Sequence, residues 1–355
     1  MARAASKKPG RRELFRDALG LCLSLAACST RPPTAVPKAR PRIEGPVSLW
    51  SWFDLPDDPR SRELSGIAWD EASRTLWAVQ DETPNIVALK PDAALKRWSF
   101  GESITINVTG PLDLEGIVLI PEGFIVCSEE GPRVVELDRR GTLRAEVRVP
   151  ARFRDARRNK SLESLTMSPN GRYLFTTSEA ALERDGAQPT GTQGTLLRLL
   201  RFERDRLGAA NEVSEHAYLT EPANGPGDHG VADLCAIGDD ELLVLERGWT
   251  KGQGNSDRIF RVRLDDRASC LGVAQLTPEA PVVEKTLFLD LARLPVAGLP
   301  EPKQPQANPV LDNYEGICLG PILPDGRASI LLVSDDNGRS DQFARVLVLG
   351  CGAAA

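Results

Sequence analysis

The sequence predicts an all-β fold, a β-propeller of five four-stranded blades. Three observations predict it: a unit of two apolar strands recurs five times, tight turns join the strands of each unit, and the first strand of the folded region has no local partner. Together they indicate a closed ring of antiparallel sheets.

Each unit begins with an apolar strand near an acidic residue or a glycine, and its second apolar strand ends in acidic residues. The five pairs lie at 65–69 and 76–82, 114–119 and 124–130, 162–167 and 173–179, 232–237 and 242–247, and 314–319 and 330–336. Segments between paired strands, such as Pro121-Glu122-Gly123, are typical of hairpin turns. A third strand follows in every unit and a fourth follows in four of them, as in propeller blades.

The two ends of the folded region complement each other. The fifth unit has no fourth strand after Leu349, and residues 47–53 form a predicted strand without a neighbour in sequence. We expect this N-terminal strand to complete the last blade, which removes two sheet edges. The longer segments 180–194, 203–213 and 292–309 are either insertions or a degenerate sixth blade.

Composition excludes several classes of protein. The chain has 355 residues, with 44 Lys and Arg against 50 Asp and Glu, a formal charge of −6 that argues against nucleic-acid binding. No apolar run in the body reaches the roughly 18 to 20 residues that span a bilayer. With only two histidines, His216 and His229, any metal site is expected to use oxygen ligands.

The N-terminus predicts export. Basic residues over 3–16 precede an apolar stretch over 18–27 that is too short for a membrane helix, so residues 1–27 read as a signal peptide. The sequence Leu25-Ala26-Ala27-Cys28 resembles a bacterial lipobox, which makes Cys28 the predicted lipidation site. The alternative is a plain signal peptide.

The remaining boundaries follow from composition. Residues 28–45 are rich in proline and suit a stiff tether, 46–351 hold the predicted propeller, and 352–355 are a tail. We expect a monomer in the cell envelope, on its periplasmic or extracellular face, whose only contact with the membrane is the lipid anchor.

The repeats place acidic residues at one rim of the central channel, because the start of the first strand and the end of the antiparallel second strand lie together. The strand starts contribute Glu63, Asp113, Glu115, Glu163, Asp228, Asp233 and Glu315. The strand ends contribute Asp81, Glu82, Glu129, Glu130, Glu179, Glu246, Asp335 and Asp336.

Gathered carboxylates raise one another's pKa unless a cation neutralises them, and oxygen ligands favour Ca²⁺ or Mg²⁺. Ca²⁺ is the first choice because it accepts roughly 6 to 8 oxygens in loose geometry. The alternative is that the carboxylates cap turns, pair with Arg133, Lys160 or Arg247, or hold a purely structural ion. The candidate metal ligands are Glu63, Asp113, Glu129, Glu179, Glu246, Glu315, Asp335 and Asp336.

Several ordered motifs resemble one known family. They are 113–117 (DLEGI), 159–165 (NKSLESL) with 168–174 (SPNGRYL), 243–248 (LVLERG), and 313–317 (NYEGI) with 333–337 (VSDDN). They are similar to the motif set of the bacterial phytase-like family, described as having esterase-like activity of phytase, over roughly 63–349. The resemblance implies an exported β-propeller that hydrolyses phosphate or carboxylic esters. Related alkaline phytases have six blades, which keeps the six-bladed alternative open.

A chemistry for the rim follows from this resemblance. Calcium would polarise a phosphoryl or acyl oxygen and lower the pKa of a bound water. Glu115 or Glu163 would act as general base, and Lys160 and Arg247 would hold the negative charge of the substrate. An ion pair with a neighbouring carboxylate is the alternative role of Arg247. His229 is a weaker candidate, and no Gly-x-Ser-x-Gly elbow supports a serine esterase.

Two functions therefore stand at the level of sequence. The first is a calcium-dependent hydrolase of a small-molecule ester or phosphoester; phytate itself is disfavoured because basic residues at the rim are few. The second is a non-catalytic envelope lipoprotein whose propeller rim binds a ligand or a protein. Among the five cysteines of the body, Cys127, Cys235 and Cys318 lie in apolar strands and are explained as small buried residues, and Cys235 with Cys270 is the first pair to test for a disulfide.

Overall fold

The computed structural model of the protein describes residues 42–204, 212–225 and 227–353. The predicted signal peptide, Cys28 and residues 28–41 of the predicted tether lie outside these residues, as do the last two residues of the tail. All described strands belong to one compact unit, which begins at Arg40. In the described part of the chain, no helix has the length and apolar character needed to cross a membrane.

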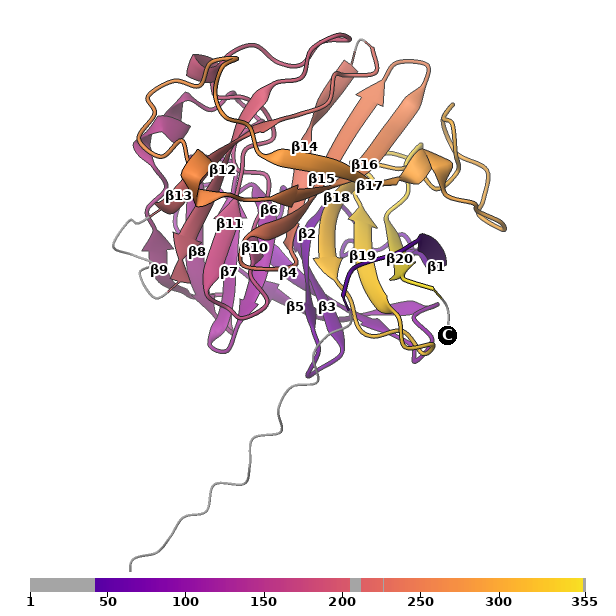
Figure 1. The fold of residues 1–355 in the computed structure, drawn as a ribbon. Coiled ribbons are helices and arrows are strands. Elements are labelled where there is room, and N and C mark those ends of the chain that lie inside the picture. The colour runs from indigo at the N-terminus through magenta and orange to yellow at the C-terminus, as the bar shows by residue number, and fades with distance from the viewer. Residues whose placement is uncertain (1–41, 205–211, 226, 354–355) are drawn as a thin grey trace, which may run out of the picture. The chain divides into compact units, whose positions relative to one another are not determined.

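Twenty described strands form five antiparallel sheets of four strands each, arranged as a ring, which confirms a five-bladed propeller (Figure 1). Blade 1 contains β2 (Leu64–Asp70), β3 (Thr75–Gln80), β4 (Asn85–Pro91) and β5 (Trp98–Thr105). Blade 2 contains β6 (Leu114–Ile120), β7 (Gly123–Ser128), β8 (Arg133–Asp138) and β9 (Leu143–Val147). Blade 3 contains β10 (Thr166–Met167), β11 (Tyr173–Thr176), β12 (Leu196–Glu203) and β13 (Glu212–Leu219).

The other two blades follow the same plan, apart from the origin of one strand. Blade 4 contains β14 (Gly227–Ala236), β15 (Glu241–Thr250), β16 (Gly254–Arg263) and β17 (Glu284–Asp290). Blade 5 contains β18 (Tyr314–Leu319), β19 (Ala328–Ser334), β20 (Arg345–Cys351) and β1 (Val47–Asp54). Short 3-10 helices lie in the connections: η1 (Ala151–Asp155), η2 (Glu183–Asp185), η4 (Asp266–Ala268) and η5 (Leu291–Arg293).

The N-terminal strand closes the ring, as the sequence predicts. β1 pairs antiparallel with β20, so that Val47 lies opposite Cys351 and Asp54 lies opposite Arg345. The fully buried Arg345 side chain also donates from Nε to Asp54 Oδ1 at 2.5 Å, which joins the two ends of the fold. The described residues contain no sixth sheet, so the segments 180–194 and 292–309 are insertions that carry only short 3-10 helices.

The apolar core lies in the five seams between neighbouring blades. Successive side chains of a strand point to opposite faces, so each middle strand serves two seams. In β15, Leu242 and Val244 pack toward blade 3, whereas Leu243 and Leu245 pack toward blade 5. Because both faces of these strands are covered, their sequences are continuous apolar runs and do not alternate between apolar and polar residues.

The innermost strands approach one another so closely that glycine is required. β2, β6, β10, β14 and β18 contact one another in turn, and β18 contacts β2 to complete the circle. A Cβ on Gly66 would lie 2.4 Å from the carbonyl oxygen of Glu115, and one on Gly116 would lie 2.6 Å from Leu165 Cβ. Side chains at these positions would therefore push neighbouring blades apart.

Bulges accompany these glycines and redirect the residues before them. In blade 2, Leu114 lies opposite Ser128 and Gly116 lies opposite Cys127, so Glu115 is an extra residue. Glu315 is the equivalent extra residue of β18. A bulge re-aims a side chain locally, and both glutamates thereby project into the centre of the ring.

Cys235 and Cys270, the first pair to test for a disulfide, are not joined in the structure. No disulfide joins any two of the five described cysteines, which are all buried thiols. Cys235 packs in the seam between blades 4 and 5, and Cys270 packs in a separate small cluster with Leu196 and Leu276. Burial as small apolar residues therefore accounts for both.

The close approach of the inner strands is testable with a pair of glycine substitutions. Gly116→Ala is expected to lower the free energy of unfolding by about 2 kcal/mol or more, because its methyl group meets Leu165. Gly191→Ala is the matched control, since nothing lies within 4 Å of a Cβ there. Urea unfolding measures both, and equal stability of the two variants would contradict the packing argument.

Candidate functional site

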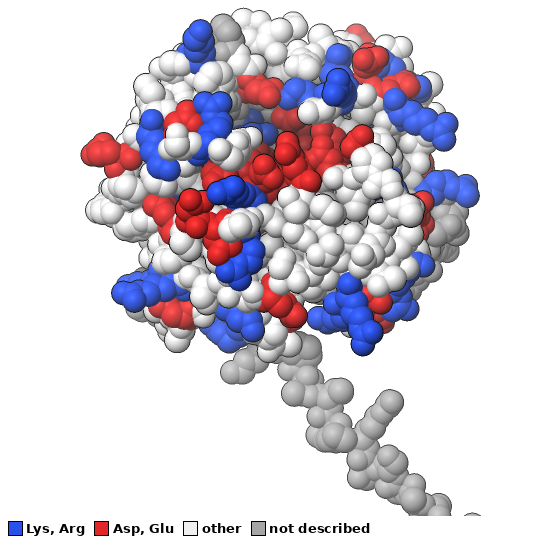
Figure 2. Space-filling model, turned by 180° about the vertical axis from the view of Figure 1, so that it is seen from behind, with Lys and Arg blue, Asp and Glu red and all other residues white. Residues whose placement is uncertain are grey.

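A cavity of about 230 Å³ lies where the five blades converge, and all five contribute to its wall. Nine carboxylates and two cations line it, and Figure 2 shows acidic side chains gathered in a band across the middle of one face. Its lining residues are Ser65, Asp81, Asp113, Glu115, Glu129, Asn159, Lys160, Glu163, Glu179, Asp228, Arg247, Glu315, Asp335 and Asn337.

The structure brings together most of the side chains that the sequence selected. Those that line the cavity are Asp113, Glu115, Glu129, Lys160, Glu163, Glu179, Arg247, Glu315 and Asp335. Four selected residues are not in the lining: Glu63, His229, Glu246 and Asp336. Asp81 and Asp228, which the sequence placed at the rim but not among the candidate ligands, also line the cavity, and Ser65, Asn159 and Asn337 are lining residues that the sequence did not select.

Ser65 illustrates a signal that the sequence contains. The segment Leu64-Ser65-Gly66-Ile67 of blade 1 parallels Leu114-Glu115-Gly116-Ile117 of blade 2, with serine in the place of the glutamate. Aligning the repeats residue by residue would have placed Ser65 in the cavity. Its hydroxyl donates to Glu115 Oε2 at 2.7 Å.

Three carboxylates form a group suited to a cation. One oxygen from each of Asp81, Asp113 and Glu115 lies within 4.8 Å of the other two. Asp113 Oδ1 is buried and has no hydrogen-bond partner among the described residues. Burial raises the pKa of Asp81 to about 9, and the neighbouring carboxyl of Asp113 adds to the rise. Close, poorly solvated oxygens of this kind are what a hard cation would stabilise.

The other carboxylates extend this acidic environment around the cavity. Burial raises the pKa of Asp335 to about 8, assisted by the charge of Glu315, and burial raises the pKa of Glu129 to about 7. Burial and the charge of Glu115 raise the pKa of Glu163 as well. The Glu163 side chain is buried in the wall of the cavity.

Two cations balance part of this charge. Lys160 Nζ lies 3.0 Å from Glu179 Oε2 and 2.7 Å from Asp228 Oδ1. Arg247 Nη1 lies 3.0 Å from Glu315 Oε1, and Nη2 lies 3.5 Å from Glu179 Oε1. The ion pair predicted as the alternative role of Arg247 is therefore present. Burial opposes the charge of Lys160, yet Glu179 and Asp228 raise its pKa.

Glu246 and His229 belong to a separate buried cluster. Glu246 Oε2 lies 3.0 Å from His229 Nε2, and Glu246 Oε1 accepts from Lys285 Nζ at 2.9 Å and from the Tyr218 hydroxyl at 2.5 Å. These contacts satisfy the glutamate within blades 3 and 4. His229 thereby serves as a partner of Glu246 and faces no carboxylate of the cavity lining.

The remaining rim residues have other positions. The backbone N–H of Glu63 lies 3.5 Å from Asp336 Oδ1, at the edge of blades 1 and 5. Asp233 is buried, and its carboxylate accepts from the N–H groups of Leu234 and Ile317, both at 2.8 Å. Asp233 thereby links blade 4 to blade 5.

Comparison with known proteins identifies one family. Residues 59–338 match the model of the phytase-like family, described as esterase-like activity of phytase. No curated protein matches the chain.

Solved structures give distant similarities. The PQQ-bound aldose sugar dehydrogenase of Streptomyces coelicolor is 13% identical with a TM-score of 0.41, covering 88% of this chain and 100% of that one. The periplasmic gluconolactonase of Pseudomonas aeruginosa is 14% identical with a TM-score of 0.33, covering 82% and 86%. Similarities at these scores carry no functional argument.

The raised pKa values predict how stability depends on pH. Carboxylates whose pKa is higher in the folded than in the unfolded chain stabilise the fold at low pH, and this contribution is lost as pH rises through the folded value. With divalent ions chelated, the free energy of unfolding is expected to fall by about 3 kcal/mol or more between pH 5 and 9, because Glu129, Asp335 and Asp81 ionise in this range with pKa values of about 7, 8 and 9.

Urea unfolding at several pH values measures this loss. Asp81→Asn is expected to flatten the slope above pH 7, because it removes the carboxyl with the highest pKa of the three. If the free energy of unfolding falls equally steeply with pH in the parent and in Asp81→Asn, the cavity carboxylates are not the cause of the pH dependence.

Proposed function

Because the chain belongs to the phytase-like family, we propose that it is a metal-dependent hydrolase of small-molecule esters or phosphoesters. The observation that carries the proposal is the combination of features in the central cavity. Three carboxylates converge there with one unpartnered buried oxygen, and two cations lie in the same wall. Such a site binds a cation and an anion together, which is what hydrolysis of a charged ester requires.

Calcium is the proposed ion, and Asp81, Asp113 and Glu115 are the residues that would hold it. All three supply oxygen atoms, and the wall offers further oxygens from Glu315 and Asp335 for the high coordination number of Ca²⁺. When bound, the ion supplies positive charge that polarises an ester or phosphoryl oxygen and lowers the pKa of water.

Lys160 and Arg247 are proposed to hold the negative charge of the substrate. Both lie in the wall, and Glu179 contacts both of them, so the two cations share one anchor. A fixed ammonium and guanidinium stabilise charge that develops on the reacting group without reorganising in the transition state. Arg247 is further oriented by Glu315 and by a hydrogen bond to Asn313.

Glu163 is proposed as the general base. It lines the same cavity, and its carboxylate has no hydrogen bond to another described residue. Burial raises its pKa, whereas the positive charge of Arg247 lowers it. A carboxylate tuned upward in this way accepts a proton from an attacking water more readily than an ordinary one.

The N-terminal sequence supports a proposed location in the cell envelope. The basic and apolar stretches over 1–27 and the Cys28 lipobox favour export and lipid anchoring. The Pro-rich segment after Cys28 would then hold the propeller away from the membrane.

Two substitutions test the proposed roles separately. Glu115→Gln is expected to weaken calcium binding, because it removes one ligand charge. Glu163→Gln is expected to keep calcium affinity and to lower kcat by about 100-fold or more, the usual contribution of a positioned base. Chromogenic phosphate monoesters, phosphate diesters and short acyl esters are assayed with calcium and with a chelator.

Glu102→Gln, an exposed change on β5 outside the cavity, is the control. Unchanged turnover in Glu163→Gln would remove that residue from the mechanism. No turnover by the parent protein on any ester, with calcium binding retained, would favour the non-catalytic ligand-binding lipoprotein.

A further inference from the structure

A groove leads away from the central cavity along blade 2 and the segment that follows it. Two cavities of about 690 and 410 Å³ form it, and they share Gly131, Pro132, Phe153 and Arg154. The smaller of these two shares Asp113, Glu129 and Asn159 with the central cavity. The three spaces therefore adjoin one another, and the two outer ones are here called the arginine groove.

The arginine groove differs in charge from the cavity that it joins. Five arginines line it, in a protein whose formal charge is −6: Arg133, Arg148, Arg154, Arg157 and Arg158. Within the described residues, Arg148, Arg154 and Arg158 have no hydrogen bond or ion pair through their side chains. Most other arginines of the fold have a carboxylate or carbonyl partner, so these three are available to a ligand.

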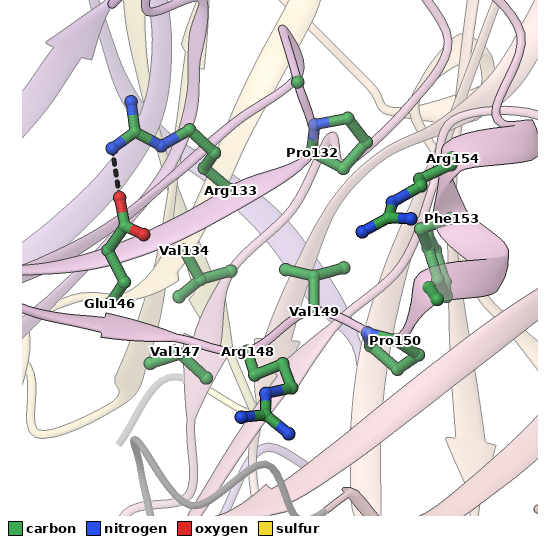
Figure 3. Close-up of a pocket in the computed structure, with 12 residues that line it drawn as sticks. Pro132, Arg133, Val134, Glu146, Val147, Arg148, Val149, Pro150, Phe153 and Arg154 are labelled. Carbon is green, nitrogen blue, oxygen red and sulfur yellow. Dashed lines mark hydrogen bonds and ion pairs between the residues drawn. The ribbon is translucent and has the colours of Figure 1, made fainter. Parts of the chain in front are cut away.

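Figure 3 shows the outer part of the groove. Arg133 pairs with Glu146, whereas the guanidinium groups of Arg148 and Arg154 lie apart from that pair. The wall around them is apolar and includes Pro132, Val149 and Phe153. Arg148 and Arg154 are both exposed, so an anion can reach them from solvent, and a guanidinium forms charge-assisted hydrogen bonds with phosphate or carboxylate oxygens.

The groove is built by segments that lie outside the repeated strand pairs. Arg148 follows β9, and Arg154 belongs to η1, which connects blade 2 to blade 3. At the level of sequence, only the basic residues of the rim bear on the charge of the substrate, and they are few. The connection between blades 2 and 3 adds further arginines to the surface beside the cavity.

We propose that the arginine groove binds a second anionic group of the substrate, a phosphate or a carboxylate carried on an apolar or uncharged linker. The inference rests on the proposed function for the reacting end, which lies in the central cavity. Attraction of the distal anion by Arg148 and Arg154, with the reacting end held in the central cavity, orients such a molecule in one direction. The groove is thus a specificity determinant, and Arg148 and Arg154 bind the distal anion without touching the reacting atoms.

Direct binding tests the groove without any hydrolysis. Phenylphosphonate carries an apolar ring and a dianion but no ester bond, and phenylacetate offers the same ring with a carboxylate. Both are titrated calorimetrically into the folded protein with divalent ions chelated. Arg148→Gln and Arg154→Gln are each expected to weaken binding about tenfold, and the double variant is expected to lose it.

Arg140→Gln is the matched control, because Arg140 is an exposed arginine of the β8–β9 turn outside the groove. The two ligands also distinguish the sources, since tighter binding of the phosphonate assigns the groove to phosphate and tighter binding of the carboxylate assigns it to carboxylic acids. Binding that is equal in the parent and the double variant would overturn the proposal.

A kinetic comparison separates this inference from the proposed function. Esters with and without a second anionic group are compared with calcium present. The double variant is expected to raise KM about 10-fold or more for the dianionic substrate and to leave the singly charged substrate unchanged. If the double variant hydrolyses the dianionic substrate as the parent does, the proposed role of the groove is wrong and the hydrolase proposal stands. If the groove binds anions but no ester is hydrolysed, the hydrolase proposal is wrong and anion binding by the groove stands.

Discussion

The close approach of five inner strands around one axis is the constraint on which the rest of this structure depends. At Gly66 and Gly116 there is no room for a Cβ between neighbouring blades. The bulges beside such glycines leave Glu115 and Glu315 as extra residues that point inward. Packing and site geometry are therefore two results of the same local feature, since a strand that can lie this close to the axis also delivers its carboxylate to the cavity.

The carboxylates gathered in the cavity repel one another, and nearby cations neutralise only part of this negative charge. Lys160 and Arg247 pair with Glu179, Asp228 and Glu315, whereas the group around Asp81 has no cation of its own among the described residues. Burial consequently shifts the pKa values of the cavity carboxyls upward. A site that is held under such strain by the seams of the propeller is prepared for a cation, because binding relieves repulsion that folding has already imposed.

Charge is also separated in space across this surface. The carboxylates come from the ends of the inner strand pairs, whereas the unpaired arginines come from the connection between blades 2 and 3. A propeller keeps its strand framework while the connections change, so recognition in the loops can vary without disturbing the centre. The adjoining acidic cavity and arginine groove suit a ligand with distinct reacting and anchoring ends.

The sequence by itself determined the all-β class, the five strand pairs, the closure by residues 47–53 and nine of the residues in the cavity wall. These follow from short-range patterns, because the hydrophobic period and the turns are written along the chain. Only the tertiary structure decided which acidic residues meet. Glu246 pairs with His229 beside Lys285, Asp233 joins two blades, and Asp81 lies beside Asp113 and Glu115. The physical reason is that bulges and partners in other blades set the direction of a side chain, and a strand pattern does not state which group of another blade a carboxylate will meet, as in the hydrogen bond from the Ile317 N–H to Asp233.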